Sequence, residues 1–197
     1  MVSAFLEPFS DFLEWIAAFL GLITVILVVR RSIWNYPFAL AMVALYFLEF
    51  VDEKLYSDAL LQIFFFLING YGWWMWRRAP AMEDGVAVER MSNSLRMTWL
   101  AATALASLLW GWAMASLTDA AAPFIDAAIA GSSVAAQSLQ SLRRVESWAL
   151  WIVADLIAVP LYWSKGLYPT AVLYGIFLIL AIVGLVKWQR TLERETT

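Results

Sequence analysis

The chain has 197 residues with a formal net charge of −3, and 63% of them are hydrophobic. Soluble domains contain about 45–50% apolar residues, so this composition and a mean hydropathy of +0.73 predict a polytopic membrane protein. There is neither cysteine nor histidine, which excludes disulfides, thiolate nucleophiles, and imidazole as a general base or metal ligand.

Seven apolar runs follow one another along the chain, each close to the ~20 residues that a helix needs to cross a bilayer. The N-terminal segment, residues 1–10, lacks the positive charge with which a cleavable signal peptide begins, so we expect it to persist as a short interfacial segment. The fifth run is rich in Ala, Ser and Gln, which is typical of a helix enclosed by others. The predicted spans are 12–29, 33–51, 57–76, 97–117, 122–142, 147–163 and 167–187.

The basic residues predict how these spans are oriented. With the N-terminus outside, eleven of the 13 Lys and Arg residues fall at inner ends, and only Lys54 and Lys165 fall outside. Cytoplasmic loops of membrane proteins carry an excess of Lys and Arg, which favours this orientation. Since the C-terminus then lies inside, the number of spans must be odd, in agreement with seven.

A weak internal repeat relates the first part of the chain to the last. Three residues in or directly beside the third span recur in or beside the seventh at one constant sequence offset: Tyr56 and Tyr168, Gly72 and Gly184, Trp76 and Trp188. The second and sixth spans each follow an Arg-Arg pair and begin with a tryptophan, Trp34 or Trp148, at spacings that differ by a few residues. We therefore expect one membrane domain over 1–197, an all-α fold of two parallel three-helix repeats, 12–76 and 122–190. A linker helix at 97–117 would join them, and transporters of this plan bind substrate between the halves near the midplane.

The sixth span carries one acid, Asp155, near the middle of an apolar run. At about 100° per residue, Trp148, Trp151, Asp155 and Tyr162 lie within roughly 60° of one another on a helix. A carboxylate at that depth costs several kcal/mol unless it faces protein, water or a ligand. In one interpretation the acid pairs with a neighbouring helix and the rings anchor the span. In the other, the rings stack on a ligand, and the acid accepts hydrogen bonds from hydroxyls or balances a positive charge.

Amide side chains on other spans favour the second interpretation. Gln62, Asn69 and Trp73 recur at helical spacing on the third span, Gln137 lies on the fifth, and Asn35 begins the second. A single intramembrane amide usually bonds a neighbouring helix, at about 0.6 kcal/mol. Amides on several helices beside aromatic rings suit a carboxamide or polyhydroxylated ligand, and a cationic ring would gain a cation–π interaction. The predicted substrate-binding residues are Gln62, Asn69, Trp73, Gln137, Trp148, Trp151, Asp155, Asn35 and Tyr162.

The residues now described resemble those of PnuC-type transporters of nicotinamide riboside. The resemblance rests on Leu55-Tyr56, Gln62, Tyr71-Gly72-Trp73 and Trp76-Arg77, and on Arg143, Glu146, Trp148, Trp151 and Asp155, and it extends from about residue 12 to 190. It implies a 3+1+3 arrangement similar to that of full-length SWEET transporters, in a bacterial inner membrane with the lipid bilayer around it. It also implies facilitated diffusion of nicotinamide riboside, a precursor of NAD, drawn forward by cytoplasmic phosphorylation. A homo-oligomer is expected, with a trimer favoured, and related members of the family carry riboflavin or thiamine.

The ligand implied by the resemblance has a cationic pyridinium, a carboxamide and a ribose. Trp73, Trp151 and Trp148 would stack on the pyridinium, the amides would meet the carboxamide or ribose, and Asp155 would bind hydroxyls or offset the charge. The spans contain no Gly-rich phosphate loop and no mid-span Lys or Arg, so phosphorylated nucleotides should be rejected.

Other classes of function fit the sequence less well. There is no Walker A motif for an ATP-driven pump, and we expect no cofactor, no metal and no nucleic-acid partner. An intramembrane hydrolase would need a lysine base, yet Lys54 and Lys165 lie at the outer edge and Lys187 lies at an inner helix end. Asp155 and Glu49 are the only deep carboxylates. Transport of riboflavin or thiamine stays open, and so does a substrate-binding subunit that needs a partner ATPase.

Overall fold

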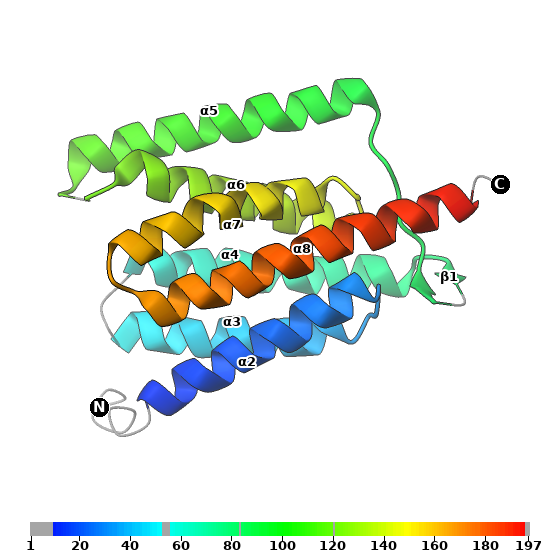
Figure 1. Ribbon diagram of the computed structural model, residues 1–197, viewed down its shortest axis with the longest axis horizontal. Coiled ribbons are helices and arrows are strands. Elements are labelled where there is room, and N and C mark those ends of the chain that lie inside the picture. Colours follow the sequence, from blue (N-terminus) through cyan, green and yellow to red (C-terminus); the bar gives the residue numbers. More distant parts are fainter. Residues whose placement is uncertain (1–9, 53–55, 83, 120, 196–197) are drawn as a thin grey trace. The chain divides into compact units, whose positions relative to one another are not determined.

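A computed structural model of the chain describes residues 10–52, 56–82, 84–119 and 121–195, and the predicted interfacial segment at 1–10 lies almost wholly outside them. Within these ranges the chain forms seven helices and one antiparallel hairpin, and each predicted span coincides with one helix (Figure 1). The helices are α2 (Ser10–Val29), α3 (Asn35–Asp52), α4 (Tyr56–Arg77), α5 (Asn93–Leu117), α6 (Pro123–Ser141), α7 (Ser147–Ser164) and α8 (Tyr168–Glu195). The strands are β1 (Ala81–Met82) and β2 (Gly85–Val86).

All seven described helices are long enough to cross most of a bilayer, and several of them are also sufficiently apolar. The shortest have 18 residues, which at 1.5 Å per residue extend about 27 Å, close to the thickness of the hydrocarbon core. Among the described residues, α5, α7 and the Tyr168–Arg194 part of α8 are long and apolar enough to cross a membrane, and Trp15–Val29 is apolar but shorter. The fold is therefore that of an all-α membrane protein. Its arrangement as two three-helix repeats in one membrane domain stays a prediction.

The first of two compact units, Met1–Ala87, is built around α3, which packs against both α2 and α4. At the start of α3, the ring of Tyr36 meets the ring of Trp76 edge-on, with centroids 5.3 Å apart and planes at 87°. Both side chains are 1% exposed. This pair fixes the end of α4 against the beginning of α3.

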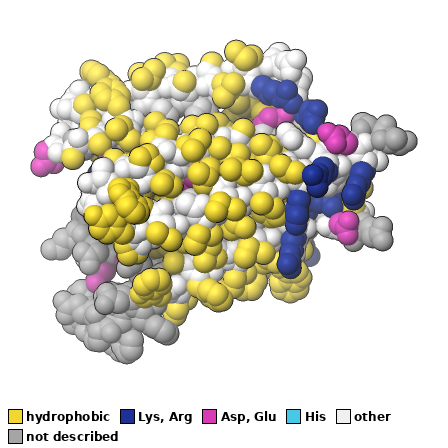
Figure 2. Space-filling model, viewed as in Figure 1, with side chains coloured by type: hydrophobic (Ala, Val, Ile, Leu, Met, Phe, Trp, Pro, Cys, Tyr) yellow, Lys and Arg dark blue, Asp and Glu magenta, His cyan; other side chains and the backbone are white. Residues whose placement is uncertain are grey.

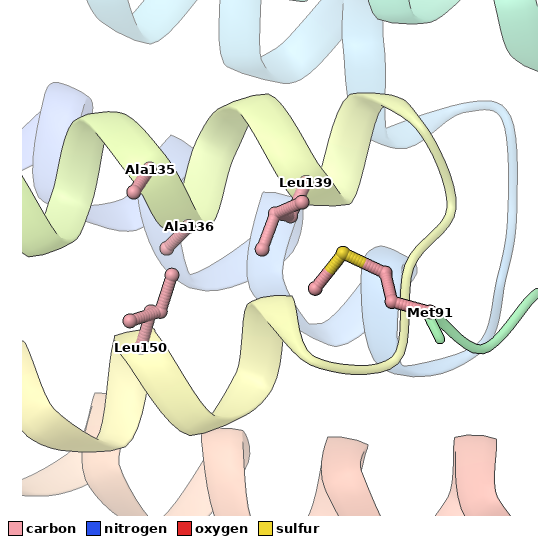
Figure 3. Packing of buried hydrophobic residues seen from close by; sticks show 5 residues of the cluster. All are labelled: Met91, Ala135, Ala136, Leu139 and Leu150. Carbon is pink, nitrogen blue, oxygen red and sulfur yellow. The ribbon is translucent and has the colours of Figure 1, made fainter. Parts of the chain in front are cut away.

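The second unit, Val88–Thr197, is built around α7, which packs against both α6 and α8, while α5 packs against α6. Trp148 of α7 meets Trp188 of α8 edge-on, with centroids 5.5 Å apart and planes at 89°. Gly184 makes room for this contact, since a Cβ there would lie 2.5 Å from the Trp148 ring. A buried cluster joins α6 and α7 to the segment before α5 and consists of Met91, Ala135, Ala136, Leu139 and Leu150 (Figure 3).

The two units share structural details at a constant sequence offset, the one that separates Trp76 from Trp188. At this repeat offset, Tyr36 of the first ring pair corresponds to Trp148 of the second. From the internal repeat in the sequence we matched Trp34 with Trp148. In the structure the equivalent of Trp148 is Tyr36, because Tyr36 is buried whereas Trp34 is 67% exposed. The aromatic ring, rather than the residue type, recurs.

The turns that precede α3 and α7 also share an unusual backbone conformation. Arg31 and Arg143, again separated by the repeat offset, both have positive φ angles, 54° and 58°, which non-glycine residues adopt infrequently. Each is only 8% exposed. The Arg31 N–H donates to the Val28 carbonyl (2.8 Å), and the Arg143 N–H donates to the Gln140 carbonyl (2.9 Å). The same tight turn therefore joins the first two helices of the first unit and joins α6 to α7.

A connector, residues 78–92, leads from α4 to α5, and each of its halves is bound to its own unit. In the first half, the Val86 N–H donates to the Arg31 carbonyl and the Arg31 guanidinium donates to the Val86 carbonyl, both at 3.2 Å. In the second half, the Glu89 N–H donates to the Arg143 carbonyl (3.0 Å), and the Glu89 carboxylate pairs with Arg143 at 2.6 Å and with Arg144 at 2.9 Å. The two buried arginines thus hold the connector in equivalent ways.

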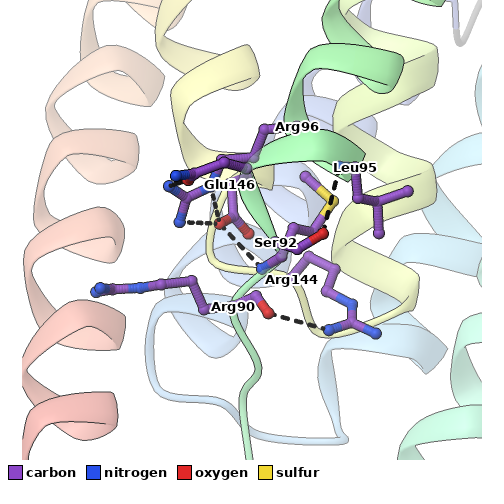
Figure 4. A network of polar contacts seen from close by, with 8 residues as sticks. Arg90, Ser92, Leu95, Arg96, Arg144 and Glu146 are labelled. Atoms are coloured by element: carbon purple, nitrogen blue, oxygen red, sulfur yellow. Dashed lines mark hydrogen bonds and ion pairs between the residues drawn. The ribbon is translucent and has the colours of Figure 1, made fainter.

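The end of the connector is held by a further polar network (Figure 4). Glu146 Oε1 accepts hydrogen bonds from the Arg96 Nε (2.8 Å) and from the Met91 N–H (3.1 Å). The Ser92 hydroxyl caps α5 by accepting from the Leu95 N–H at 3.3 Å. This cap begins α5 shortly before the start of the predicted span.

Basic side chains gather at one end of each unit. In the first unit they lie where α2 and α4 end, and in the second where α5 and α7 begin and α6 and α8 end. Figure 2 shows apolar side chains over the helices and Lys and Arg side chains near helix ends. This segregation is typical of helices whose middle lies in hydrocarbon.

Candidate functional site

The second unit holds a polar strip in the interface between α6 and α7. The Trp151 indole N–H donates to the Gln140 side-chain oxygen at 2.9 Å, which fixes the level at which the two helices meet. Gln137 lies one turn from Gln140 on α6, and Asp155 lies one turn from Trp151 on α7. Because the short 142–146 connection makes the helices antiparallel, Gln137 and Asp155 lie at about the same level, one turn further from that connection.

Asp155 is buried, with 4% of its surface exposed. Among the described residues of its own unit, no side chain forms a hydrogen bond or an ion pair with its carboxylate. The four residues of the strip, Gln137, Gln140, Trp151 and Asp155, thus combine two amides, one half-buried ring and one acid. This set can accept hydrogen bonds from hydroxyls, pair with a carboxamide and compensate a positive charge.

The other aromatic residues predicted on α7 lie in different surroundings. Trp148 is 1% exposed, enclosed by Trp188 and Gly184 of α8, and its indole nitrogen is buried without a hydrogen-bond partner among the described residues. Tyr162 is half-buried and lies against Tyr174 of α8, with ring centroids 5.2 Å apart. Of the predicted stripe, Trp151 therefore contacts α6, Trp148 and Tyr162 contact α8, and Asp155 is buried between these positions on α7.

In the first unit, the predicted residues lie at different depths. Asn35 is buried at the first residue of α3, where its amide donates to the Ser32 carbonyl at 2.7 Å and ties the turn. Asn69 of α4 is 4% exposed and donates to the Phe65 carbonyl at 2.8 Å. Gln62 and Trp73 are half-buried on the same helix. Because Trp76 lies against Tyr36, Asn69 lies two turns, or about 10 Å, deeper in the unit than Asn35.

The polar residues break the correspondence between the two units. At the repeat offset, the position equivalent to Asp155 is Val43, and the position equivalent to Asn69 is Ala181, and each of these is 2% exposed. Packing at these positions is thus achieved by apolar side chains in the other unit. The polar side chains of Asp155 and Asn69 are therefore not part of the packing that the two units share.

Trp73 also lines a cavity of about 460 Å³ on α4, together with Gly70, Trp74, Arg77 and Arg78. Arg77 and Arg78 give this cavity a positively charged lining, whereas the polar strip of the second unit contains the acid Asp155. Among the described residues, no group of three carboxylates is placed to hold a metal ion.

One contact in the strip was not predicted from the sequence. Gln140 was recognised as one of several polar residues on its helix, but not as the partner of Trp151. The feature of the sequence that could have indicated this role of Gln140 is its i, i+3 spacing from Gln137, which places both amides on the same side of α6.

Comparisons with known proteins identify the family to which the chain is similar. Residues 11–190 match the family described as nicotinamide mononucleotide transporter. The nicotinamide riboside transporter PnuC of Escherichia coli is 28% identical over an alignment of 204 residues. The alignment covers 89% of this chain and 85% of that protein. The riboflavin/roseoflavin transporter RibM of Streptomyces davaonensis is 28% identical over 190 residues, 93% of this chain and 87% of that protein. A crystal structure of the vitamin B3 transporter PnuC matches with a TM-score of 0.79 and 25% identity, and covers 98% of this chain and 88% of that one.

Proposed function

Since the chain belongs to the family of nicotinamide mononucleotide transporters, we propose that it carries nicotinamide riboside across the bacterial inner membrane. The family is one of multi-pass membrane transporters and not of enzymes. The curated relative from Escherichia coli is named for the same solute. The observation that carries the proposal for this chain is the buried Asp155 beside the bonded pair Trp151 and Gln140.

The chemistry of the strip matches the parts of this solute. The pyridinium ring is flat and positively charged, so a half-buried indole offers a stacking surface and a cation–π interaction. The carboxylate of Asp155 offsets the charge of the pyridinium or accepts from the ribose hydroxyls. Gln137 and Gln140 offer amides to the carboxamide or the ribose, and Asn69 and Gln62 are the proposed contribution of the first unit. We assign Trp148 to packing against Trp188, and Asn35 to formation of the turn before α3, where it bonds the Ser32 carbonyl.

The riboside suits the chain better than the phosphorylated nucleotide. All Lys and Arg residues lie outside the apolar runs or at their ends, so the membrane interior offers no cation to a phosphate. An isolated phosphate dianion inside the membrane would have no compensating charge. Phosphorylation after entry would therefore trap the product in the cytoplasm.

We propose that transport proceeds by alternating access of two parallel three-helix repeats, 12–76 and 122–190, with α5 as the linker. The recurrence of the edge-on ring pairs and of the left-handed arginine turns at one sequence offset supports this division. Each half of the connector is bound to its own unit, so Ala87–Val88, between the two anchors, is the natural pivot. We place the N-terminus outside and the C-terminus in the cytoplasm, and expect a homo-oligomer, with a trimer favoured.

Riboflavin is the second candidate, because RibM is as similar in identity as the PnuC relative. Riboflavin has no positive charge, so it would leave Asp155 uncompensated. The experiment is a binding titration of the purified chain with nicotinamide riboside, nicotinamide, riboflavin and thiamine. We expect tightest binding of the riboside and weaker binding of nicotinamide, which lacks both the ribose and the charge. Tightest binding of riboflavin would overturn the assignment.

A further inference from the structure

The cavity on α4 has features that the transport of a cationic solute does not explain. It is an open surface cavity with a volume of about 460 Å³, and its lining includes Arg77 and Arg78. Two guanidinium groups would repel a pyridinium cation. The positive charge of the cavity therefore suits an anionic ligand, distinct from the cationic substrate.

The guanidinium group of Arg78 is held in place by an aromatic ring. Its central carbon lies 4.0 Å from the centroid of the Trp74 indole, a cation–π contact. Stacking occupies one face of the guanidinium and leaves its N–H edge available to bind the oxygens of a phosphate in a bidentate manner. Arg77, the neighbouring residue, lines the same cavity and adds a second positive charge.

Three earlier residues on the same face of α4 are apolar and exposed. Leu60, Ile63 and Leu67 precede Gly70 at helical spacing, and their side chains are 67%, 43% and 66% exposed. At Gly70 the face is notched, since nothing lies within 4 Å of the place where a Cβ would be. An acyl chain that follows this face would reach the notch and place its headgroup beside Trp74 and the two arginines.

The second unit lacks this arrangement. The residues that correspond to Gly70, Trp74 and Arg77 at the repeat offset are Ile182, Val186 and Gln189. Arg190 corresponds to Arg78, so a cation at the inner helix end recurs without the notch or the indole. The general excess of inner cations therefore does not account for the cavity on α4.

We propose that the cavity formed by Gly70, Trp73, Trp74, Arg77 and Arg78 binds the phosphate of an anionic phospholipid, whose acyl chain lies along the exposed face of α4. Lys and Arg side chains next to the end of a membrane helix attract anionic lipid headgroups. A lipid is favoured over a soluble phosphate because the exposed apolar stripe leads directly into the cavity.

The test uses the full chain, purified in detergent, stripped of lipid and titrated with phosphatidylglycerol or phosphatidylcholine. Native mass spectrometry counts the lipid that each chain retains. We expect phosphatidylglycerol to be retained at least tenfold more tightly than phosphatidylcholine, and an Arg77→Ala/Arg78→Ala variant to lose this preference. The matched control, Lys187→Ala/Arg190→Ala, removes two inner cations of the second unit and should keep it. Equal retention of phosphatidylglycerol by both double variants would overturn the proposal.

A second variant keeps the charges and fills the notch. Gly70→Leu introduces a side chain where there is open space, so we expect an unchanged melting temperature and at least tenfold weaker retention of phosphatidylglycerol. Glycerol phosphate added to the wild type separates a lipid site from a general phosphate site. Displacement of the lipid by glycerol phosphate at comparable concentration would refute the lipid assignment. So would a Gly70→Leu variant that changes its oligomeric state and retains lipid, because the face would then be a protein interface.

Discussion

Replacement of Asp155 by Asn tests whether the buried acid faces the substrate or another helix. The amide keeps the shape of the side chain and one acceptor oxygen but removes the negative charge. If Asp155 binds the substrate, the loss of a charge-assisted hydrogen bond should cost about 1.5–3 kcal/mol of binding free energy. Since about 1.4 kcal/mol corresponds to a factor of ten, affinity for nicotinamide riboside should fall roughly 10- to 150-fold.

The stability of the same variant separates the two interpretations. In the second unit, no described side chain pairs with Asp155, so removal of an uncompensated intramembrane charge should leave the melting temperature unchanged or raise it. Removal of one partner of a buried ion pair would instead destabilise the fold by about 3–5 kcal/mol. Isothermal titration calorimetry and thermal unfolding of the purified protein measure the two quantities.

The matched control is Asp126→Asn, which removes an acid from the first turn of α6, where it pairs with Lys165 at 3.8 Å and is 49% exposed. This variant should bind nicotinamide riboside like the wild type. A folded Asp155→Asn variant with unchanged affinity would contradict the substrate role. A joint fall in affinity and melting temperature would show that Asp155 pairs with another helix.

Trp151→Phe should weaken substrate binding less than Trp151→Ala. Both variants lose the 2.9 Å hydrogen bond to Gln140 of α6, worth about 1 kcal/mol, but only Trp151→Phe keeps an aromatic ring for stacking. Equal affinities of the two variants in the titration would speak against stacking. Gly184→Ala should destabilise the protein by about 1–3 kcal/mol in thermal unfolding, since the new Cβ would lie 2.5 Å from an indole. Gly175→Ala in the same helix has nothing within 4 Å and should be neutral or stabilising, and an equal loss in both would dismiss the packing argument. A topology reporter fused at Gly85 should be cytoplasmic and one fused at Asp52 extracellular, and the reverse labelling would invert the proposed orientation.

The helices could be predicted from the sequence because their signal is local. A run of about 20 apolar residues is sufficient to indicate a span, and the seven predicted runs coincide with the seven described helices. Helix ends were less accurate where polar residues continue the helix beyond the apolar run. The last helix extends to Glu195, whereas its predicted span ended at residue 187.

The division of the α7 residues between two neighbours could not be predicted. Trp148 and Trp151 lie within roughly 60° of each other on the helix, so their spacing alone does not say which neighbour each ring meets. In the structure Trp148 packs against Trp188, because Gly184 leaves space on α8 for the indole ring. Trp151 instead donates a hydrogen bond to Gln140, because the short turn between α6 and α7 brings these two residues to the same height. Asp155 was identified correctly as a buried intramembrane acid. Its role in binding stays a prediction.

The most direct test of the proposed function is uptake of labelled nicotinamide riboside into sealed vesicles that contain only the purified chain. The proposal predicts saturable uptake that stops at equal inner and outer concentrations and that needs neither ATP nor an imposed ion gradient. Asp155→Asn vesicles should take up the riboside more slowly, whereas Asp126→Asn vesicles should match the wild type. Uptake that occurs only with a partner ATPase, or only with a proton gradient, would contradict facilitated diffusion by this chain alone.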